Sequence, residues 1–235
     1  MMPHDRFFTE NDLAEGSLVS LADEELHHLT RVMRAKCGDL VECFNGKGKL
    51  AKAQVQKNLK ELLVEHVSFQ APPLNPLEIC QALVRPAKLE LILEKGVELG
   101  MSRLSVFRGD GSEKVNISEN QKKRFQKIIV NACKQSGQLW LPKLEEIKSL
   151  EAFQGSEKRL FFGDTASDAL RFEDVWKKQV PKKGAVFFVG PEKGFSSREE
   201  KVLSDLGATG VKLSELILRT ETAPIAAMSL MGHWG

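Results

Sequence analysis

The sequence AVFFVGPEKGFSSREE, residues 185–200, decides the fold of this protein. Its five apolar residues, Ala185–Val189, predict a buried strand. Ser196 or Ser197 begins a predicted helix, with Glu199 and Glu200 in capping positions. Between strand and helix, the glycines of residues 190–195 permit a tight turn whose backbone can approach a ligand closely. This order of elements is typical of an α/β protein with a parallel sheet.

The same alternation of strands and helices continues on both sides of this stretch. Pro86 opens a predicted helix over residues 86–99, and the capping pair Ser118 and Gln121 opens another over residues 118–137. The other predicted elements are strands at 79–84, 106–107, 159–162 and 210–213, a loop at 214–219 and a helix at 220–234. We expect a mainly parallel sheet covered on both faces, with ligands at the carboxyl ends of its strands.

The first third of the chain has a different pattern, and the prolines of residues 70–76 separate it from the rest. Its short apolar stretches predict strands at 17–21, 39–44, 50–56 and 62–67, with a turn at 45–48 and one helix at 22–33. These elements predict a small β-domain over residues 1–71, followed by an α/β domain over residues 72–235.

Composition limits the classes of function. The 235 residues include 34 lysines and arginines against 32 aspartates and glutamates, so a surface for nucleic acid would be a local basic patch. No stretch approaches the roughly 18 to 20 apolar residues of a membrane helix, and the cysteines form no Cys-x-x-Cys pair. We therefore expect a soluble, cytoplasmic protein without a metal. Residues 190–195 match neither the Walker A loop nor the glycine pattern of NAD-binding folds.

A second polar loop, in LSELILRTETAPIAAM at residues 213–228, precedes an apolar helix. GPEKGF and LILRTETA together resemble the GPEGGF and LGxRILRTETA signatures of the ribosomal RNA small subunit methyltransferase E family, within the SPOUT methyltransferases. The resemblance covers nearly the whole chain, since four further stretches look like motifs of that family: HHLTRVMRAKCGD at 27–39, FNGKG at 44–48, LILEKGVELG at 91–100 and ACKQSGQ at 132–138.

This resemblance implies a fold and an activity. The fold is an N-terminal PUA-like β-barrel domain followed by a SPOUT α/β domain, with a C-terminal deep trefoil knot within about residues 160–235, and the protein is a homodimer. The activity is transfer of a methyl group from S-adenosylmethionine to N3 of a uridine in 16S rRNA. The cofactor-binding candidates in the two matching loops are Gly190, Pro191, Glu192, Gly194, Leu213, Ser214, Ile217 and Leu218, and we expect the strand end Phe162 and Gly163 to join them.

Catalytic and RNA-binding candidates follow from the same motifs. Arg219 is the candidate for stabilising the uridine anion or holding the nucleotide, because it matches the family's arginine. Glu221 is the candidate base, although it also fits as a first-turn carboxylate after Thr220 as N-cap. Basic residues that would position RNA through its phosphates are Arg31, Arg34, Lys114, Lys123 and Lys127.

Several motif positions differ from the family pattern. Lys193 stands in place of a glycine, Ser214 in place of another glycine, and Leu216 in place of an arginine. Lys114 also replaces an arginine, which loses bidentate contact with phosphate. These differences leave two alternatives open: a SPOUT enzyme that modifies another RNA position, and a catalytically weak RNA-binding protein that retains the fold.

Overall fold

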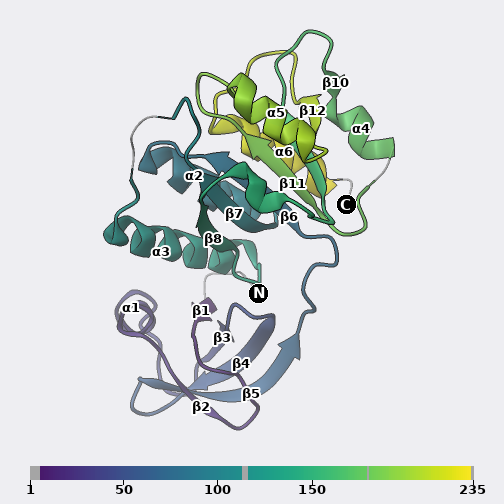
Figure 1. Ribbon diagram of the computed structural model, residues 1–235. Helices are drawn as coiled ribbons and strands as arrows, with labels where there is room; N and C mark the ends of the chain where they lie inside the picture. Colours follow the sequence, from purple (N-terminus) through teal and green to yellow (C-terminus); the bar gives the residue numbers. More distant parts are fainter. Residues whose placement is uncertain (1–5, 113–115, 179, 234–235) are drawn as a thin grey trace. The chain divides into compact units, whose positions relative to one another are not determined.

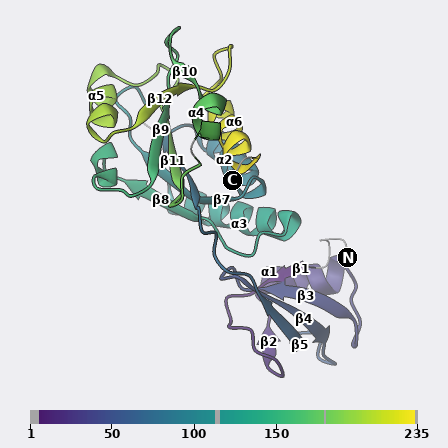
Figure 2. The ribbon, with the colours of Figure 1, turned by 90° about the vertical axis from the view of Figure 1, so that its right-hand side faces the viewer.

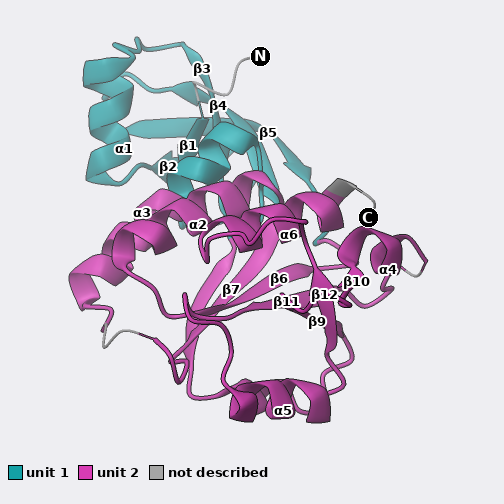
Figure 3. Cartoon of the chain, turned by 90° about the horizontal axis from the view of Figure 1, so that it is seen from above, with its two compact units in different colours: residues 1–72, 130–141 teal, residues 73–129, 142–235 magenta. Residues whose placement is uncertain are grey.

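The computed structural model describes residues 6–112, 116–178 and 180–233. The chain forms two compact units, and Figure 1 shows the helices and strands of each. The first unit comprises residues 1–72 and 130–141, and the second comprises residues 73–129 and 142–235 (Figure 3). The bounds of these units differ from the domain boundary predicted at residue 71, because residues 130–141 belong to the first unit. The boundary between two domains at residue 71 stays a prediction.

A five-stranded mixed sheet forms the first unit, as Figure 2 shows most clearly for the neighbouring strands β3, β4 and β5. The strand order is β1-β3-β4-β5-β2, and only β1 and β3 run parallel. Their bounds are β1 (Arg6–Phe8), β2 (Leu18–Ser20), β3 (Leu40–Phe44), β4 (Lys49–Val55) and β5 (Glu61–Phe69). The β-domain predicted for this part of the chain is therefore confirmed, with β1 as an additional strand.

The core of the first unit is apolar, and a short helix packs against it. The predicted helix at 22–33 is divided: α1 (Asp23–His27) continues as a π-helical segment, His28–Val32, and only Leu29 of the two is fully buried. Buried residues from every strand complete the core, among them Phe7, Val19, Val41, Ala53 and Leu62. At the predicted 45–48 turn, the Asn45 side chain accepts hydrogen bonds from the amides of Lys47 and Lys49.

A parallel sheet of seven strands forms the second unit, in the order β10-β12-β9-β11-β6-β7-β8. Its strands are β6 (Leu77–Ala82), β7 (Met101–Phe107), β8 (Lys143–Ile147), β9 (Arg159–Gly163), β10 (Leu170–Arg171), β11 (Ala185–Val189) and β12 (Thr209–Lys212). Every residue of β11 is buried, because helices cover both faces of the sheet. The predicted α/β architecture is confirmed.

The helices lie in two layers, one on each face of this sheet (Figure 3). On one face, α2 (Pro86–Glu98) contacts β7 and α6 (Thr222–His233), and α6 also contacts β6 and β11. On the other face, α5 (Ser197–Asp205) and the 3₁₀ segment Leu150–Phe153 pack against a cluster that includes Phe188 and Leu203. Alternate residues of β11 therefore face different layers.

Two further helices complete the fold. In α4 (Phe172–Lys178), Phe172 packs edge-on against Phe187, with ring centroids 5.2 Å apart. The long helix α3 (Glu119–Ser136) begins in the second unit and ends in the first. Its predicted capping pair is confirmed, since the Ser118 amide donates to Gln121 Oε1 and the Gln121 amide donates to Ser118 Oγ. The trefoil knot stays a prediction.

Candidate functional site

The ends of three parallel strands, β9, β11 and β12, meet at one edge of the second sheet and border a pocket of about 700 Å³. Its lining comes from within residues 163–167 at the end of β9, 189–195 at the end of β11 and 211–223 at the end of β12, together with Lys88 from α2. The pairing of Phe188 with Phe162 and of Val211 with Gly163 brings these strand ends to the same level. This is the ligand edge that a parallel sheet predicts.

The first loop, residues 190–195, turns tightly back towards its own start. The Gly194 amide donates to Pro191 O at 2.9 Å, and Gly194 has φ of +82°, a conformation that favours glycine. A Cβ on Gly190 would lie 3.1 Å from the Phe195 nitrogen and 3.2 Å from its ring, so a side chain there would require Phe195 to shift by a few tenths of an ångström. Glycine therefore suits both positions in this pocket wall.

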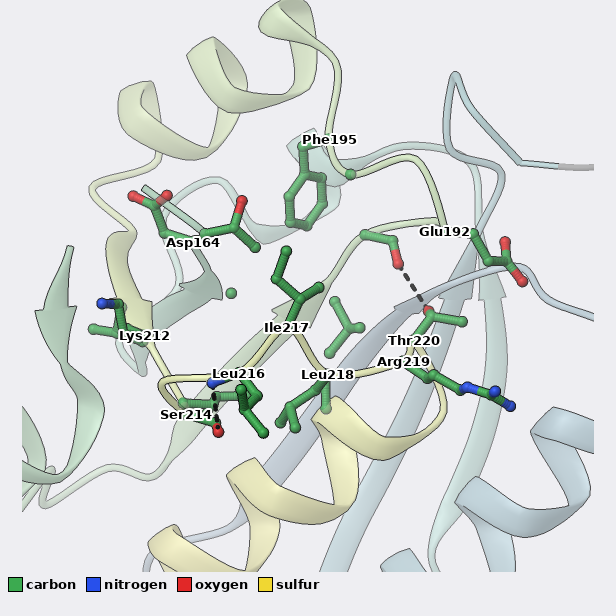
Figure 4. Close-up of a pocket in the computed structure, with 18 of the residues that line it drawn as sticks. Asp164, Glu192, Phe195, Lys212, Ser214, Leu216, Ile217, Leu218, Arg219 and Thr220 are labelled. Carbon is green, nitrogen blue, oxygen red and sulfur yellow. Dashed lines mark hydrogen bonds between the residues drawn. The ribbon is translucent and has the colours of Figure 1, made fainter. Parts of the chain in front are cut away.

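The second loop, residues 213–218, presents apolar side chains to the pocket. Ile217 lies between Phe195 and Leu218 in Figure 4, and its side chain is 85% exposed. Leu216, at the position of the family's arginine, is 78% exposed and also lines the pocket. The Ser214 hydroxyl accepts a hydrogen bond from the Leu216 amide, which shapes the turn. The exposed apolar wall is suited to the flat face of an aromatic ring.

Thr220 joins the second loop to the first. Its hydroxyl donates to Gly190 O at 2.9 Å (Figure 4) and accepts a hydrogen bond from Gln81 Nε2 at 3.0 Å. Gln81 is fully buried at the end of β6, so this chain of contacts is anchored in the sheet. The prediction that Thr220 is the N-cap of a helix starting there is wrong. Its hydroxyl donates to Gly190 O, and α6 begins at Thr222.

Lys88 lies between two carboxylates that line the pocket. Its Nζ is 2.8 Å from Glu192 Oε1 and 3.1 Å from Glu221 Oε2. The hydrogen bond from Lys88 lowers the pKa of Glu192 below its ordinary value. Burial raises the pKa of Glu221, but its own backbone amide, Lys88 and Arg219 together lower this pKa overall. Both glutamates are therefore ionised at neutral pH.

The pocket brings together most of the residues that the motifs predict. Its lining includes both catalytic candidates and nine of the ten cofactor candidates: Gly163, Gly190, Pro191, Glu192, Gly194, Leu213, Ser214, Ile217 and Leu218. The tenth, Phe162, does not line the pocket but packs edge-on against Phe195 at a centroid distance of 6.0 Å. Phe162 therefore supports the wall from behind.

The two catalytic candidates differ in burial. Arg219 is exposed at the rim, whereas the side chain of Glu221 is only 13% exposed and directly precedes α6. Figure 4 places Arg219 on the same side of the pocket as Glu192, away from Asp164. A cation at the rim and a carboxylate inside it could contact one bound nucleotide from two directions.

Sequence reasoning missed several lining residues. The position of Lys88, in the first turn of a helix that follows a strand, indicated that it could line a ligand site. Its ion-pair partners could not be read from the sequence, because they are more than 100 residues away. Asp164 directly follows β9, and its carboxylate accepts a hydrogen bond from the Ala166 amide. Polar residues after the strand ends of a parallel sheet were the general signal for both.

The charged groups in the lining nearly balance. Four carboxylates, on Asp164, Glu192, Glu215 and Glu221, face three cations, on Lys88, Lys212 and Arg219. The pocket is therefore negative by one charge, which favours a ligand with one net positive charge. Lys193, which replaces a glycine of the motif, is exposed and absent from the lining, so it does not place its charge in the pocket.

The RNA-binding candidates lie on exposed parts of the two units. In the first unit, Arg31 lies in the π-helical segment, and Arg34 follows it with φ of +55°, an unusual value for a non-glycine residue. In the second unit, Lys123 and Lys127 are exposed on α3. Lys114 lies outside the described residues.

Other basic residues near these candidates serve as ion-pair partners. Lys122 contacts Glu119 and Glu146, and Arg124 contacts Glu90. Lys134 is paired with Glu25 at 2.9 Å, and both side chains are 13% exposed. Fewer basic side chains of α3 are therefore available to contact phosphates than its sequence suggests.

Neither a membrane-spanning helix nor a metal-binding cluster is present among the described residues. No helix within it has the length and apolar character needed to cross a bilayer. Within the same residues, no group of three or more His, Cys, Asp or Glu side chains is arranged to hold a metal ion.

Family models match both parts of the chain. The model for an RNA methyltransferase domain matches residues 70–232, and the model for an RNA methyltransferase PUA domain matches residues 21–65. The first match covers more than half of the chain and includes every residue that lines the pocket. The PUA-like assignment of the N-terminal β-domain is thus confirmed.

Individual relatives agree with this assignment. Proteins named ribosomal RNA small subunit methyltransferase E are 26% identical in Buchnera aphidicola, covering 96% of this chain and 92% of the relative, and 29% identical in Bacillus subtilis, covering 96% and 93%. A crystal structure of the Neisseria gonorrhoeae enzyme of that name, bound to S-adenosylmethionine, is 29% identical with a TM-score of 0.84, covering 99% of this chain and 98% of that one. The chain belongs to the ribosomal RNA small subunit methyltransferase E family of RNA methyltransferases.

Proposed function

We propose that this protein methylates N3 of a uridine in 16S rRNA and takes the methyl group from S-adenosylmethionine. The observation that carries the proposal is the pocket, because both motif loops of the family converge on it and line it together. The names of the relatives support rRNA of the small subunit as the substrate class, and the ligand of the Neisseria enzyme supports the cofactor.

The pocket fits S-adenosylmethionine in size, charge and chemistry. Its volume is within the range of roughly 300 to 1,000 Å³ that is usual for ligand sites. Its single net negative charge complements the single net positive charge of the cofactor. Ile217, Leu218 and the backbone of residues 190–195 are suited to hold the adenine and ribose. When bound, the cofactor supplies an electrophilic methyl group on a sulfonium.

The protein's own contribution is alignment and proton handling. Uridine N3 loses its proton only above neutral pH, so the enzyme must stabilise the anion or accept the proton as the N–C bond forms. Glu221 is ionised and largely buried, and we assign it the proton acceptor's role. Arg219 at the rim would stabilise the anionic base or its phosphate. No metal is required for this displacement.

RNA capture is assigned to exposed cations outside the pocket. Arg31 and Arg34 of the PUA-like domain, proposed as residues 1–71, and Lys123 and Lys127 of α3 would contact phosphates. Lys114 keeps this role as a prediction. We also propose that the protein acts as a homodimer, which sedimentation of the purified protein would test directly.

Two experiments test the proposed function. Calorimetric titration of the purified protein with S-adenosylmethionine should show saturable binding, and a folded protein that releases no heat of binding would refute the enzymatic reading in favour of an RNA-binding protein. Modified nucleotides should then be mapped in 16S rRNA from a strain that lacks the gene. Loss of one N3-methyluridine is expected, whereas loss of a different mark would favour an enzyme for another RNA position.

A further inference from the structure

We propose that Lys88 is a positioning residue that fastens the two pocket loops to each other and to α2. The assignment concerns a residue outside both cofactor-loop motifs, which the family resemblance did not single out. Its mechanical part stands on the geometry alone. Its second part, that Lys88 keeps Glu221 ready to accept a proton, rests on the proposed function.

The position of Lys88 is fixed by its helix. Pro86 begins α2, and the buried side chains of Leu89 and Ile92 hold the first turns against the sheet. Lys88 projects from this rigid turn into the pocket lining. Its ammonium is thus a fixed cation to which both loops can be attached.

Each loop contributes one carboxylate to this cation. Glu192 belongs to the first loop, at 2.8 Å, and Glu221 follows the second, at 3.1 Å. Because both oxygens contact the same nitrogen, they are at most about 6 Å apart. Without the ammonium, two ionised carboxylates at this separation would repel each other. Removal of Lys88 should therefore separate the loops, and not merely delete a contact.

The ion pairs supplement a neutral bridge between the same two segments. The hydroxyl of Thr220 donates to Gly190 O, so the backbone is joined near the start of the first loop. Lys88 joins the side chains two residues farther along the first loop and one residue after Thr220. Two attachments fix the relative orientation of the loops, which a single hinge would leave free to rotate.

Three charged groups lie around Glu221. Lys88 faces it from α2, Glu192 from the first loop, and Arg219 from its own segment. Lys88 and Arg219 lower the pKa of Glu221, while burial raises it. With Lys88 removed, burial and the nearby Glu192 carboxylate both favour the protonated form, so this pKa should rise.

The mechanical part is tested on the ligand-free protein by amide hydrogen exchange. Lys88→Met should accelerate exchange in both residues 190–195 and residues 213–221, whereas Lys88→Arg, which keeps the charge and can reach both carboxylates, should restore most of the protection. Lys95→Met is the matched control, because Lys95 lies on the same helix and pairs with Glu94 and Glu98. Unchanged exchange in either loop of Lys88→Met would overturn the proposal.

A second variant guards against a general folding defect. Glu192→Gln removes one carboxylate and leaves Lys88 in place, so it should loosen residues 190–195 more than residues 213–221. In the double variant with Lys88→Met, Glu192→Gln should slow exchange relative to Lys88→Met alone, since it removes the repulsion. If the two substitutions instead accelerated exchange additively in the double variant, the proposed role of Lys88 would be contradicted.

The second part is tested by binding and by the pH profile. Lys88→Met should bind S-adenosylmethionine about tenfold more weakly by calorimetry, as expected for the loss of a charged contact that orders a binding loop. The acid limb of its rate profile should move to higher pH, and Lys88→Arg should return it. An unmoved acid limb would refute the role in ionisation. Failure of the unaltered protein to bind S-adenosylmethionine would refute the proposed function. The exchange comparison would still show whether Lys88 fastens the two loops.

Discussion

The hydroxyl of Thr220 donates a 2.9 Å hydrogen bond to the carbonyl oxygen of Gly190, across 30 residues of sequence. This bond joins the start of the first loop, directly after β11, to the segment between the second loop and α6. Gln81, buried at the end of β6, donates to the same hydroxyl and so attaches the junction to a central strand. The pocket wall is therefore one connected structure.

Thr220→Val should destabilise the protein and loosen the pocket, because it keeps the shape of the side chain but leaves Gly190 O without its donor. A buried group that loses its partner costs about 1 to 3 kcal/mol. Urea unfolding measures the loss, and calorimetry should show weaker binding of S-adenosylmethionine. Thr222→Val, at an exposed position two residues later, is the control. Equal stability of the two variants would contradict the role of the bond.

Arg219→Ala should lower turnover on small ribosomal subunits far more than it lowers cofactor affinity. Loss of a group that stabilises developing charge typically costs roughly 100-fold in kcat, whereas Arg219 lies at the rim and leaves the apolar wall intact. Single-turnover rates and calorimetric affinities on the same preparation separate the two effects. Equal losses in rate and affinity would assign Arg219 to cofactor binding instead.

Glu221 should contribute stability that depends on pH. Because its pKa in the folded protein is below the ordinary 4.5, the ionised form stabilises the fold above that pH, and this contribution is lost as pH falls through the lowered value. The difference in Tm between the unaltered protein and Glu221→Gln should be largest at neutral pH and shrink at pH 4. Glu200→Gln, exposed on α5, is the comparison variant. A difference that stays constant with pH would argue against the ion pair.

The pairing of Lys134 with Glu25 should be structural. Lys134→Met leaves a nearly buried carboxylate unpaired in the first unit and also removes the ammonium from above the Phe7 ring. We expect a loss of roughly 2 to 4 kcal/mol in urea unfolding, largely recovered when Glu25→Leu is added. Lys123→Met on the same helix serves as the comparison, since Lys123 is exposed. A loss no larger than that of Lys123→Met would show that the pair is dispensable.

We expect Arg34 to contact RNA while its backbone adopts a strained conformation. Arg34→Ala and Arg34→Gly both remove the charge, so both should weaken binding to 16S rRNA and reduce the salt dependence by about one counterion. Only the glycine relieves the left-handed conformation, and Arg34→Gly should therefore be more stable than Arg34→Ala by about 1 kcal/mol. Equal stability, or unchanged RNA affinity, would remove the case for a strained binding residue.

Local signals in the sequence predicted much of the fold. The buried strand β11, the helix opened by Pro86 and the capping box of Ser196 with Glu199 all depend on neighbouring residues, and all three are present in the structure. The predicted strand at 106–107 was too short, because β7 begins at Met101 in a stretch that contains polar side chains. The strand β8 was missed for a related reason: three of the five residues in Lys143–Ile147 are charged, and the strand lies at an edge of the sheet.

The site was predicted through its motifs, and the remainder depended on contacts between distant residues. Nine of the ten cofactor candidates line the pocket, and their role in binding the cofactor stays a prediction. Lys88 was missed because its partner Glu192 lies 104 residues away. The orientation of Lys193 could not be read from its charge, since the turn around Gly194 decides which side chains face outwards.

The first unit comprises two separate stretches of the chain, so the ribosome makes its two parts at different times. The Trp140 side chain donates to Gln70 O, and residue 140 forms a bridge with Lys47. These bonds join residues 47–70 to a segment that the ribosome makes only after residues 73–129, which belong to the second unit. The five strands of the N-terminal sheet all lie within residues 6–69, but the contacts of Lys47 and Gln70 with Trp140 can form only after residue 140 has left the exit tunnel, when α2 and β7 have already emerged.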